Sequence, residues 1–210
     1  MQRLYFVRHG QTEWNAIARM QGQWNSDLND LGRRQADTNG QLLGQLDIQA
    51  IYASPLDRTR QTTEIIQKYV PLDATYDHRI MEWDCGHWSG YLYEEIKTRW
   101  EEEWEALEAD RFNYRGPGCE NYPDMIERAS PFVEEILQDP AENIAIVSHG
   151  MIGRVMIGLV MQFTEPEMLG FTQPNDVVYR IDVPRNQLGE PQLNHYSAGA
   201  GPHDGVIKNW

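Results

Sequence analysis

Two histidine–glycine pairs stand out in this sequence, because each directly follows an apolar run. His9 and Gly10 follow "LYFVR", and His149 and Gly150 follow "IAIVS". Between the two pairs, the stretch "SPLDRTRQT" carries Arg58 near the expected start of a helix. An imidazole can act as a nucleophile near neutral pH, and a guanidinium can bind two oxygens of an anion at once. Together these residue types suit chemistry on a bound oxyanion.

Taken alone, each of these residues has an ordinary structural explanation. A histidine at a strand end is usually a structural residue, and a glycine there usually makes a turn. The joint pattern is more informative, because ligands of open α/β sheets gather beyond the carboxyl ends of the strands, near helix N-termini. We therefore expect Arg8, His9, Arg58 and His149 to meet in one crevice.

The elements that must position these residues alternate between strand and helix. We expect strands over 3–7, 49–54, 142–149, 176–183 and 191–197, and helices over 30–46, 55–70 and 151–161. Asn29 or Asp30 is placed to cap the first of these helices, and Pro55 suits the start of the second. The apolar positions of the helix over 30–46 are Leu31, Ala36, Leu42, Leu43 and Leu46. This alternation predicts an α/β fold, a three-layer α/β/α sandwich with a mostly parallel sheet.

Two segments depart from the alternation. Residues 84–116 form an insertion, in which the spacing of Ile96, Trp100, Trp104 and Leu107 predicts one amphipathic helix over 94–111. We expect this helix to dock on the body, with a lid over a pocket as the alternative. The glycine-rich tail over 198–210 is either a frayed terminus or a mobile flap that brings His203 or Lys208 over the site. We interpret residues 1–210 as a single domain.

Composition limits the classes of partner. The chain has 210 residues, 40% of them hydrophobic, and a formal charge of −14, which argues against nucleic acid or an anionic membrane as the main partner. No apolar run approaches the roughly 20 residues of a membrane helix. The start lacks a signal-peptide pattern, and the two cysteines, Cys85 and Cys119, show no disulfide spacing. We therefore expect a cytoplasmic protein; secretion fits less well.

Several motifs resemble, in order, those of the histidine phosphatase superfamily, the phosphoglycerate mutase-like proteins. The matching stretches are "LYFVRHGQTEWN" (4–15), "DLNDLGRRQA" (27–36), "YASPLDRTRQT" (52–62), "IMEWDCGHWSG" (80–90), "PGCENYPDMIER" (117–128) and "IVSHG" (146–150). The resemblance covers most of the chain from Leu4 to Gly150. It implies a phosphoglycerate mutase-like fold with a small helical insertion over the active site.

The resemblance also implies roles for individual residues. His9 is the expected nucleophile, which forms a phosphohistidine, and Glu82 is the expected proton donor and acceptor. The residues expected to hold the phosphoryl group or the substrate are Arg8, Arg58, His149, Asn15, Gln21, Gly22 and Gly150. Asp84 is the other acid of its motif, but the spaced glycines and tryptophan that follow favour Glu82. No metal or other cofactor is expected.

The chemistry of these residue types agrees with those roles. Arg8 and Arg58 should lower the pKa of His9, which favours its nucleophilic free-base form. Fixed guanidiniums and a helix N-terminus stabilise the charge of a phosphoryl group in transfer. Glu82 can donate a proton only while protonated, and Met81 and Trp83 on either side of it predict an apolar setting that favours this form.

Three alternatives remain open at the level of the sequence. His78, Glu82, Cys85 and His87 could bind zinc, although their spacing fits no tight pattern. Hydrolysis of a small phosphorylated metabolite is the preferred function, and a cofactor-dependent phosphoglycerate mutase is the runner-up. The insertion lacks the paired arginines of such mutases and offers Lys97, Arg99, Arg111 and Arg115 among many acids. The third alternative is a family member that binds phosphate without catalysis.

The tryptophans and Cys119 each allow two interpretations, and the oligomeric state stays open. Tryptophans in or near the motifs either pack in the core or line a pocket for a ring-shaped substrate. They are Trp14, Trp24, Trp83, Trp88 and Trp100. Cys119 is either an ordinary reduced thiol or, in its glycine-bearing loop, a reactive one. The strands over 176–197 or the tryptophan-bearing helix leave room for a homodimer.

Overall fold

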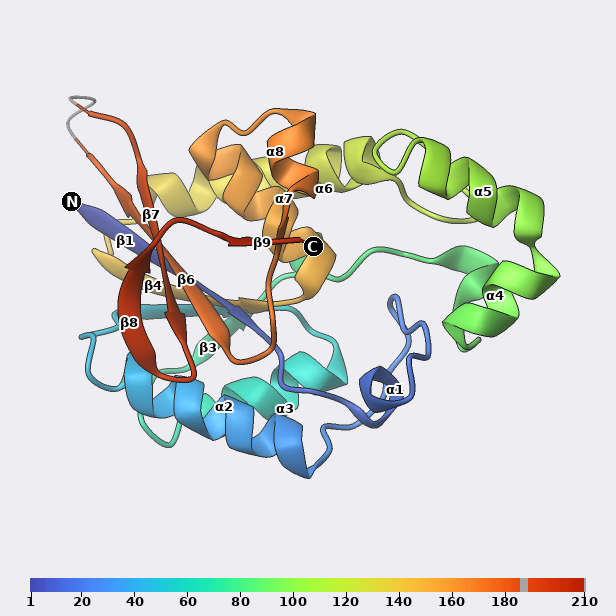
Figure 1. The fold of residues 1–210 in the computed structure, drawn as a ribbon. Helices are drawn as coiled ribbons and strands as arrows, with labels where there is room; N and C mark the ends of the chain where they lie inside the picture. Colours follow the sequence, from blue (N-terminus) through green and yellow to red (C-terminus); the bar gives the residue numbers. More distant parts are fainter. Residues whose placement is uncertain (186–188, 210) are drawn as a thin grey trace.

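A seven-stranded sheet with the order β3-β2-β4-β1-β6-β7-β8 forms the middle layer of the computed structural model, which describes residues 1–185 and 189–209 (Figure 1). Its strands are β1 (Gln2–Arg8), β2 (Ala50–Ala53), β3 (Ala74–Tyr76), β4 (Asn143–Ser148), β6 (Val177–Val183), β7 (Gln192–Ser197) and β8 (Ala200–Asp204). The first four pair in parallel, and β6, β7 and β8 are added by antiparallel pairings. Five of the seven strands, β1, β2, β3, β4 and β7, therefore run in one direction, and the predicted mostly parallel sheet is confirmed.

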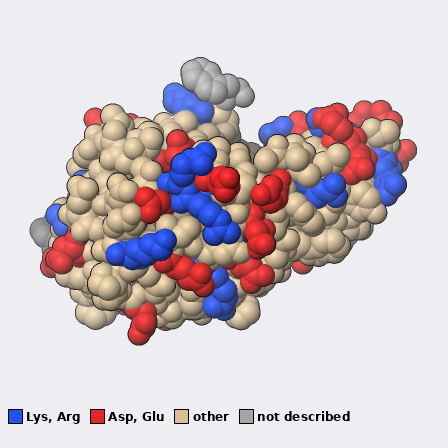
Figure 2. Space-filling view, turned by 90° about the horizontal axis from the view of Figure 1, so that it is seen from below, with Lys and Arg blue, Asp and Glu red and all other residues tan. Residues whose placement is uncertain are grey.

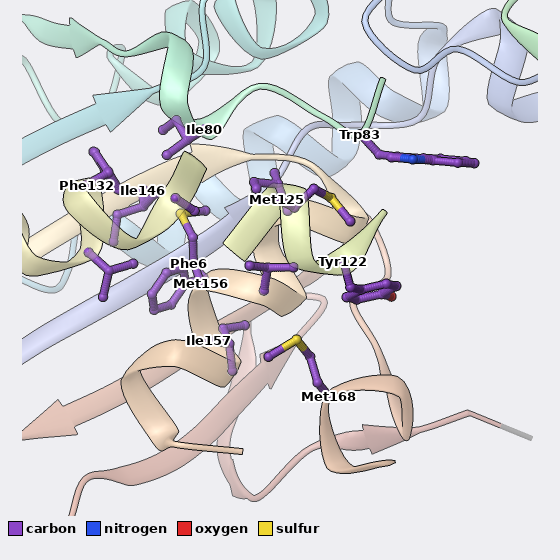
Figure 3. Close-up of a cluster of buried hydrophobic side chains, with 14 of the residues drawn as sticks. Phe6, Ile80, Trp83, Tyr122, Met125, Phe132, Ile146, Met156, Ile157 and Met168 are labelled. Carbon is purple, nitrogen blue, oxygen red and sulfur yellow. The ribbon is translucent and has the colours of Figure 1, made fainter. Parts of the chain in front are cut away.

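Helices cover both faces of this sheet, so the predicted three-layer architecture is confirmed as well. The helices α2 (Asp30–Leu43) and α3 (Asp57–Ile66) lie on one face, and α6 (Tyr122–Gln138) and α7 (Gly150–Met161) lie on the other (Figure 1). Alternate side chains of β1 enter the two cores. Tyr5 and Val7 pack toward α2 and α3, whereas Leu4 and Phe6 pack toward α6 and α7. Figure 3 shows Phe6 in the second core.

Local signals set most helix boundaries. The side chain of Asn29, one of the two candidates, caps α2 by accepting the N–H of Gly32. The helix α3 begins at Asp57, two residues after the expected start at Pro55. Leu31, one of the apolar positions of this helix, lies outside the core, because its side chain is 41% exposed. The buried Ala36 lies five positions after Leu31, which places the two side chains about 140° apart around the helix.

The insertion contains two helices where one was expected, α4 (Tyr93–Arg99) and α5 (Glu101–Ala109). The break falls at Trp100, whose φ of −132° and ψ of 53° are not helical. The ring of Trp100 packs against His87 and Tyr91, with centroids 4.8 Å and 5.1 Å away, and this tertiary contact competes with helix continuation. Both helices project from the body (Figure 1), and acidic side chains gather on the projecting part (Figure 2).

The C-terminal tail carries two strands as far as Asn209, and its last residue, Trp210, lies outside the described residues. His203 lies in β8, where its ring packs against His195 in β7. Lys208 lies in β9 (Ile207–Lys208), which pairs with β5 (Phe171–Thr172). The remaining short elements are α1 (Glu13–Ala16), α8 (Glu165–Leu169) and the 3-10 helices η1 (His78–Ile80) and η2 (Gly86–Trp88). Within residues 1–185 and 189–209, none of the helices has the length and apolar character needed to cross a bilayer.

Candidate active site

A cavity of about 500 Å³ lies beyond the carboxyl ends of the parallel strands, as the sequence predicts. The expected site residues that line it are Arg8, His9, Asn15, Gln21, Gly22, Arg58, Glu82 and Gly150. His149 is fully buried and contacts Arg58 from behind the cavity wall. The structure thus brings together every residue that was expected at the site, from β1, α1, α3, α7 and the loops between them.

His9 follows β1 and is held in one orientation. Its Nδ1 lies 2.7 Å from the carbonyl oxygen of Gly10. A carbonyl can only accept, so Nδ1 carries the proton and Nε2 carries the lone pair. Burial lowers the pKa of His9 well below its ordinary value, and the positive charges of Arg58 and Arg8 lower it further. His9 therefore presents a neutral imidazole with an available lone pair at neutral pH.

Arg58, the second residue of α3, connects the two histidines. Its Nε–H lies 3.2 Å from Nε2 of His9 and 3.2 Å from Nδ1 of His149. Its two terminal nitrogens donate to the carbonyl oxygens of Trp24 and Gly22, at 2.8 Å and 2.7 Å. These bonds fix the plane of a guanidinium that is only 1% exposed. Burial lowers the pKa of Arg58 to about 10, which still leaves it charged at neutral pH.

His149 completes this arrangement as a neutral group. Nδ1 accepts from Arg58, so Nε2 carries the proton and donates to Oγ of Ser54 at 2.8 Å. Burial, followed by the positive charge of Arg58, lowers the pKa of His149 well below its ordinary value. Ser54 follows β2, so the ends of three parallel strands are joined through the two imidazoles and the guanidinium.

Gly10 is required by a close approach of two backbones. A Cβ at this position would overlap the carbonyl oxygen of Gly32, at the start of α2. The N–H of Gly10 donates to Oγ1 of Thr62 in α3, at 3.1 Å. The glycine therefore allows α2 and α3 to close against the loop that holds His9.

Arg8 enters the cavity at the end of β1. Its Nη1 donates to the carbonyl oxygen of Gln173 at 2.9 Å, and its buried Nε has no hydrogen-bond partner among the described residues. A Cβ at Gly150 would lie 3.3 Å from Cζ of Arg8, so the glycine allows this guanidinium to approach the start of α7. Burial lowers the pKa of Arg8, and the charge of Glu82 opposes that shift.

Glu82 lies against the N-terminus of α7. Its Oε1 accepts the N–H groups of Trp83 and Ile152, at 3.0 Å and 3.1 Å, and its Oε2 accepts the N–H of Met151 at 3.3 Å. The expectation of an apolar setting is therefore wrong, because backbone donors surround this carboxyl group. They hold it at the cavity wall, whereas Asp84 is not among the residues that line the cavity.

Two side-chain amides are turned toward the cavity by Thr12. The N–H of Thr12 donates to Oδ1 of Asn15, and its hydroxyl donates to Oε1 of Gln21, both at 3.1 Å. In each amide the oxygen is therefore used by Thr12, and the NH₂ group, which has no hydrogen-bond partner among the described residues, is available to donate to a ligand. Gly22 has a φ of +50° and lies against Cys85, where a Cβ would overlap the sulfur. The carbonyl oxygen of Gly22 contributes to the site by accepting a hydrogen bond from Arg58, which it helps to orient.

Three further arginines that the motifs do not contain line the cavity: Arg19, Arg111 and Arg154. With Arg8 and Arg58 they make five guanidiniums facing one carboxylate, Glu82, in a chain whose formal charge is −14. The spacing of Arg154 carries a signal, because it lies four residues after Gly150 and so on the same helix face. Arg19 and Arg111 are brought in by loops, which give no such signal.

The zinc hypothesis is not supported by the arrangement of its residues. Among residues 1–185 and 189–209, no three His, Cys, Asp or Glu side chains are grouped so that they could hold a metal ion. His87 instead lies 2.9 Å from Glu103, and its Nδ1 donates to the carbonyl oxygen of Pro117 at 2.8 Å. His78, Glu82, Cys85 and His87 therefore do not form one site.

Several of the solved structures that resemble this chain are those of phosphatases. An alpha-ribazole phosphatase from Shigella flexneri superposes with a TM-score of 0.86 at 20% identity, over 97% of this chain and 100% of that one. A mycobacterial glucosyl-3-phosphoglycerate phosphatase in complex with VO3 superposes with a TM-score of 0.79 at 25% identity, over 87% of this chain and 93% of that one. The first likeness shows the shared fold.

Sequence relatives carry names of two kinds. "Phosphoserine phosphatase 1" of Hydrogenobacter thermophilus is 32% identical over 157 residues, which is 74% of each chain. A "Probable phosphoglycerate mutase GpmB" of Salmonella choleraesuis is 31% identical over 189 residues, 89% of this chain and 87% of the relative. The model of the histidine phosphatase superfamily (branch 1) matches residues 4–195. The chain therefore belongs to the histidine phosphatase superfamily.

Proposed function

We propose that this protein hydrolyses a small phosphorylated metabolite through a phosphohistidine at Nε2 of His9. The observation that carries the proposal is the pair of contacts on this imidazole. The Nδ1–H is bound by the carbonyl of Gly10, and the lone pair of Nε2 faces Arg58 at the cavity wall. The nucleophilic nitrogen and the cations that bind a phosphoryl group thus share one site.

In the first step, Nε2 of His9 forms a bond to phosphorus while the bond from phosphorus to the alcohol oxygen breaks. The leaving oxygen takes a proton from Glu82, which must be protonated for this step; the negative charge of the bound phosphoryl group favours that form. The bond from Nδ1–H to Gly10 stays in place and compensates the positive charge of the phosphorylated ring. Arg8, Arg58 and the N-terminus of α7 stabilise the charge on the transferring oxygens without reorganisation.

In the second step, water attacks the phosphorus of phosphohistidine. Glu82 takes a proton from this water, the bond between phosphorus and Nε2 breaks, and inorganic phosphate leaves. The free imidazole and the protonated carboxyl group are then restored, so the cycle closes. Neither step needs a metal ion.

Paired cations favour a phosphatase over a mutase. A mutase must hold a second anionic group of its substrate, yet Arg111 is bound by both carboxylate oxygens of Glu108, at 2.7 Å and 2.6 Å. Lys97 is similarly paired with Glu94 at 2.9 Å. The second candidate, a phosphoglycerate mutase, is supported by Arg154, which lines the cavity and has no carboxylate partner among the described residues. It is also supported by the names of several relatives.

The test is hydrolysis of p-nitrophenyl phosphate in EDTA by the wild type and by His9→Ala. We expect activity that survives EDTA and is lost in the variant. Conversion of 3-phosphoglycerate with a bisphosphoglycerate primer, without hydrolysis, would instead support the mutase. Binding of vanadate without turnover of any ester would support a binding protein.

A further inference from the structure

A second cavity, of about 370 Å³, adjoins the one that contains His9. The two share lining residues, so they are continuous, and the shared residues are Met20, Trp83, Tyr93, Arg111, Met151, Arg154 and Asn209. The volume lies in the range of sites for small molecules. A ligand with its phosphoryl group at His9 would therefore extend the rest of its body into this second space.

The wall of the second cavity is mostly apolar and aromatic. We call it the aromatic pocket and define it by six residues: Trp83, Trp104, Leu107, Tyr114, Tyr122 and Leu169. They come from α5, α6, α8, the loop after α5 and, for Trp83, the loop between η1 and η2. Figure 3 shows Trp83 and Tyr122 together at one end of the buried cluster, away from Phe132 and Ile146. The pocket thus opens where the core beneath α6 and α7 ends.

Contacts behind the wall hold its rings in place. Trp88 is fully buried, and its ring lies 6.2 Å from that of Trp83 and 6.1 Å from that of Trp104. The indole N–H of Trp83 donates to the carbonyl oxygen of Glu120. Edge-to-face packing at 6.1 Å joins Trp104 to Tyr93. A pocket whose rings are already ordered loses little conformational entropy when it binds a flat ligand.

The charged side chains that line the second cavity beside the aromatic pocket are largely paired within the protein. Lys97 is paired with Glu94, Arg111 with Glu108, and Glu120 with Arg128. Only Arg154, at the border with the first cavity, has no carboxylate partner among the described residues. A second dianion would compete with these carboxylates for the cations, whereas an uncharged ring would leave the pairs intact. The chemistry of the wall therefore favours a flat apolar group.

We propose that the aromatic pocket binds the leaving group of the substrate, and that this group is an alcohol with a flat, apolar ring system. The assignment rests on the proposed function for the position of the phosphoryl group at His9. It makes Trp104 and Leu107, from the insertion, specificity-determining residues. Among the tryptophans noted in the sequence, Trp83 lines the pocket and Trp88 packs behind it, while Trp14, Trp24 and Trp100 line neither cavity.

Two esters test the kinetic consequence. 2-Naphthylmethyl phosphate and ethyl phosphate both release primary alcohols, so their comparison reports mainly on binding of the body. We expect kcat/KM to be at least about tenfold higher for the naphthylmethyl ester, a ratio that corresponds to about 1.4 kcal/mol. Trp104→Ala and Leu107→Asp should each remove most of this preference, by lowering kcat/KM for the naphthylmethyl ester.

Leu31→Ala is the matched control, because Leu31 is an exposed leucine on α2 that lines neither cavity. It should keep the full preference. Circular dichroism identifies variants that fail to fold. If Trp104→Ala fails, the half-buried Leu107 still tests the pocket. Equal kcat/KM values for the two esters, or an unchanged preference in a folded Leu107→Asp protein, would overturn the proposal.

A binding experiment separates this proposal from hydrolysis itself. Calorimetry measures the dissociation constants of 2-naphthylmethylphosphonate and ethylphosphonate. In both compounds a P–C bond, which is not hydrolysed, replaces the P–O bond of the ester. Tighter binding of the naphthylmethyl compound by about tenfold, lost in Leu107→Asp, would support the aromatic pocket even if no ester were turned over. In that case only the proposed hydrolysis would fail. Equal binding of both compounds would overturn the pocket whether or not hydrolysis occurs.

Discussion

The Nε–H group of Arg58 points at Nε2 of His9 from 3.2 Å, so a buried positive charge faces the lone pair of the imidazole. This contact has two consequences. It disfavours protonation of His9. It also places a guanidinium next to the position that an oxygen of a phosphoryl group on Nε2 would take. Both the nucleophile and its anion site therefore depend on how α3 is docked against the end of β1.

Acid should destabilise the protein through its buried histidines. The pKa values of His9 and His149 lie well below 6.5 in the folded state and near 6.5 in the unfolded chain, so the unfolded state binds more protons below that pH. The free energy of unfolding should fall as the pH drops below 6.5, by up to about 1.4 kcal/mol per pH unit for each histidine. Urea unfolding at pH 7.5 and 5.5 measures this. His9→Asn should show a smaller loss; an equal loss would contradict neutral burial of His9.

Arg58→Lys should reduce kcat by about 10²–10³-fold, the loss typical of one removed donor to a transition-state oxyanion. Lysine keeps the charge and loses the fork that reaches His9, His149 and two carbonyls. The carbonyls of Gly22 and Trp24 would lose their donors, at a cost of about 1–3 kcal/mol each. Steady-state kinetics and thermal unfolding check both effects. Arg60→Lys, two residues along α3, is the control, and a similar loss of kcat there would argue against a special role for Arg58.

Glu82→Gln should slow hydrolysis of ethyl phosphate more than hydrolysis of p-nitrophenyl phosphate. The reason is that p-nitrophenolate can leave without a proton, whereas an alkoxide needs one. The amide can still accept from Trp83 and Ile152, while its NH₂ group would face the N–H of Met151. We therefore expect a modest loss of stability, of about 1 kcal/mol. Asp84→Asn should affect neither ester. Equal losses on the two esters in Glu82→Gln would remove Glu82 from the role of proton donor.

Neither cysteine should react readily in the folded protein. Burial raises the pKa of Cys85 well above its ordinary value and that of Cys119 to about 12, so the reactive thiolate is scarce at pH 8. Iodoacetamide should label both thiols at least about tenfold more slowly in the native state than in urea, as followed by mass spectrometry. Rapid native labelling of Cys119 would restore the hypothesis of a reactive thiol.

The parts of the site that the sequence predicts are those with a local signal. An apolar strand that ends in Arg8-His9-Gly10 or His149-Gly150 fixes which sheet edge receives these side chains, because parallel strands share their carboxyl ends. The same logic places Arg58 at the start of α3. These predictions need only the periodicity of the chain and the direction of the strands.

The parts that the sequence does not predict arise from contacts between distant segments. Trp100 breaks the expected helix because it packs against His87 and Tyr91. Arg8 is oriented by the carbonyl of Gln173, which lies 165 residues further along the chain. The neighbours of Glu82 along the chain are apolar, yet its hydrogen-bond donors come largely from α7. No local pattern contains this information.

The most direct test of the central claim is to trap the phosphorylated enzyme. Wild-type protein mixed with p-nitrophenyl phosphate is quenched in alkali, which preserves phosphohistidine, and its peptides are analysed by mass spectrometry. We predict one phosphoryl group on His9, none on His149, and none anywhere in His9→Ala. A phosphoryl group on another residue, or hydrolysis by His9→Ala at the wild-type rate, would contradict the role of His9 as the nucleophile.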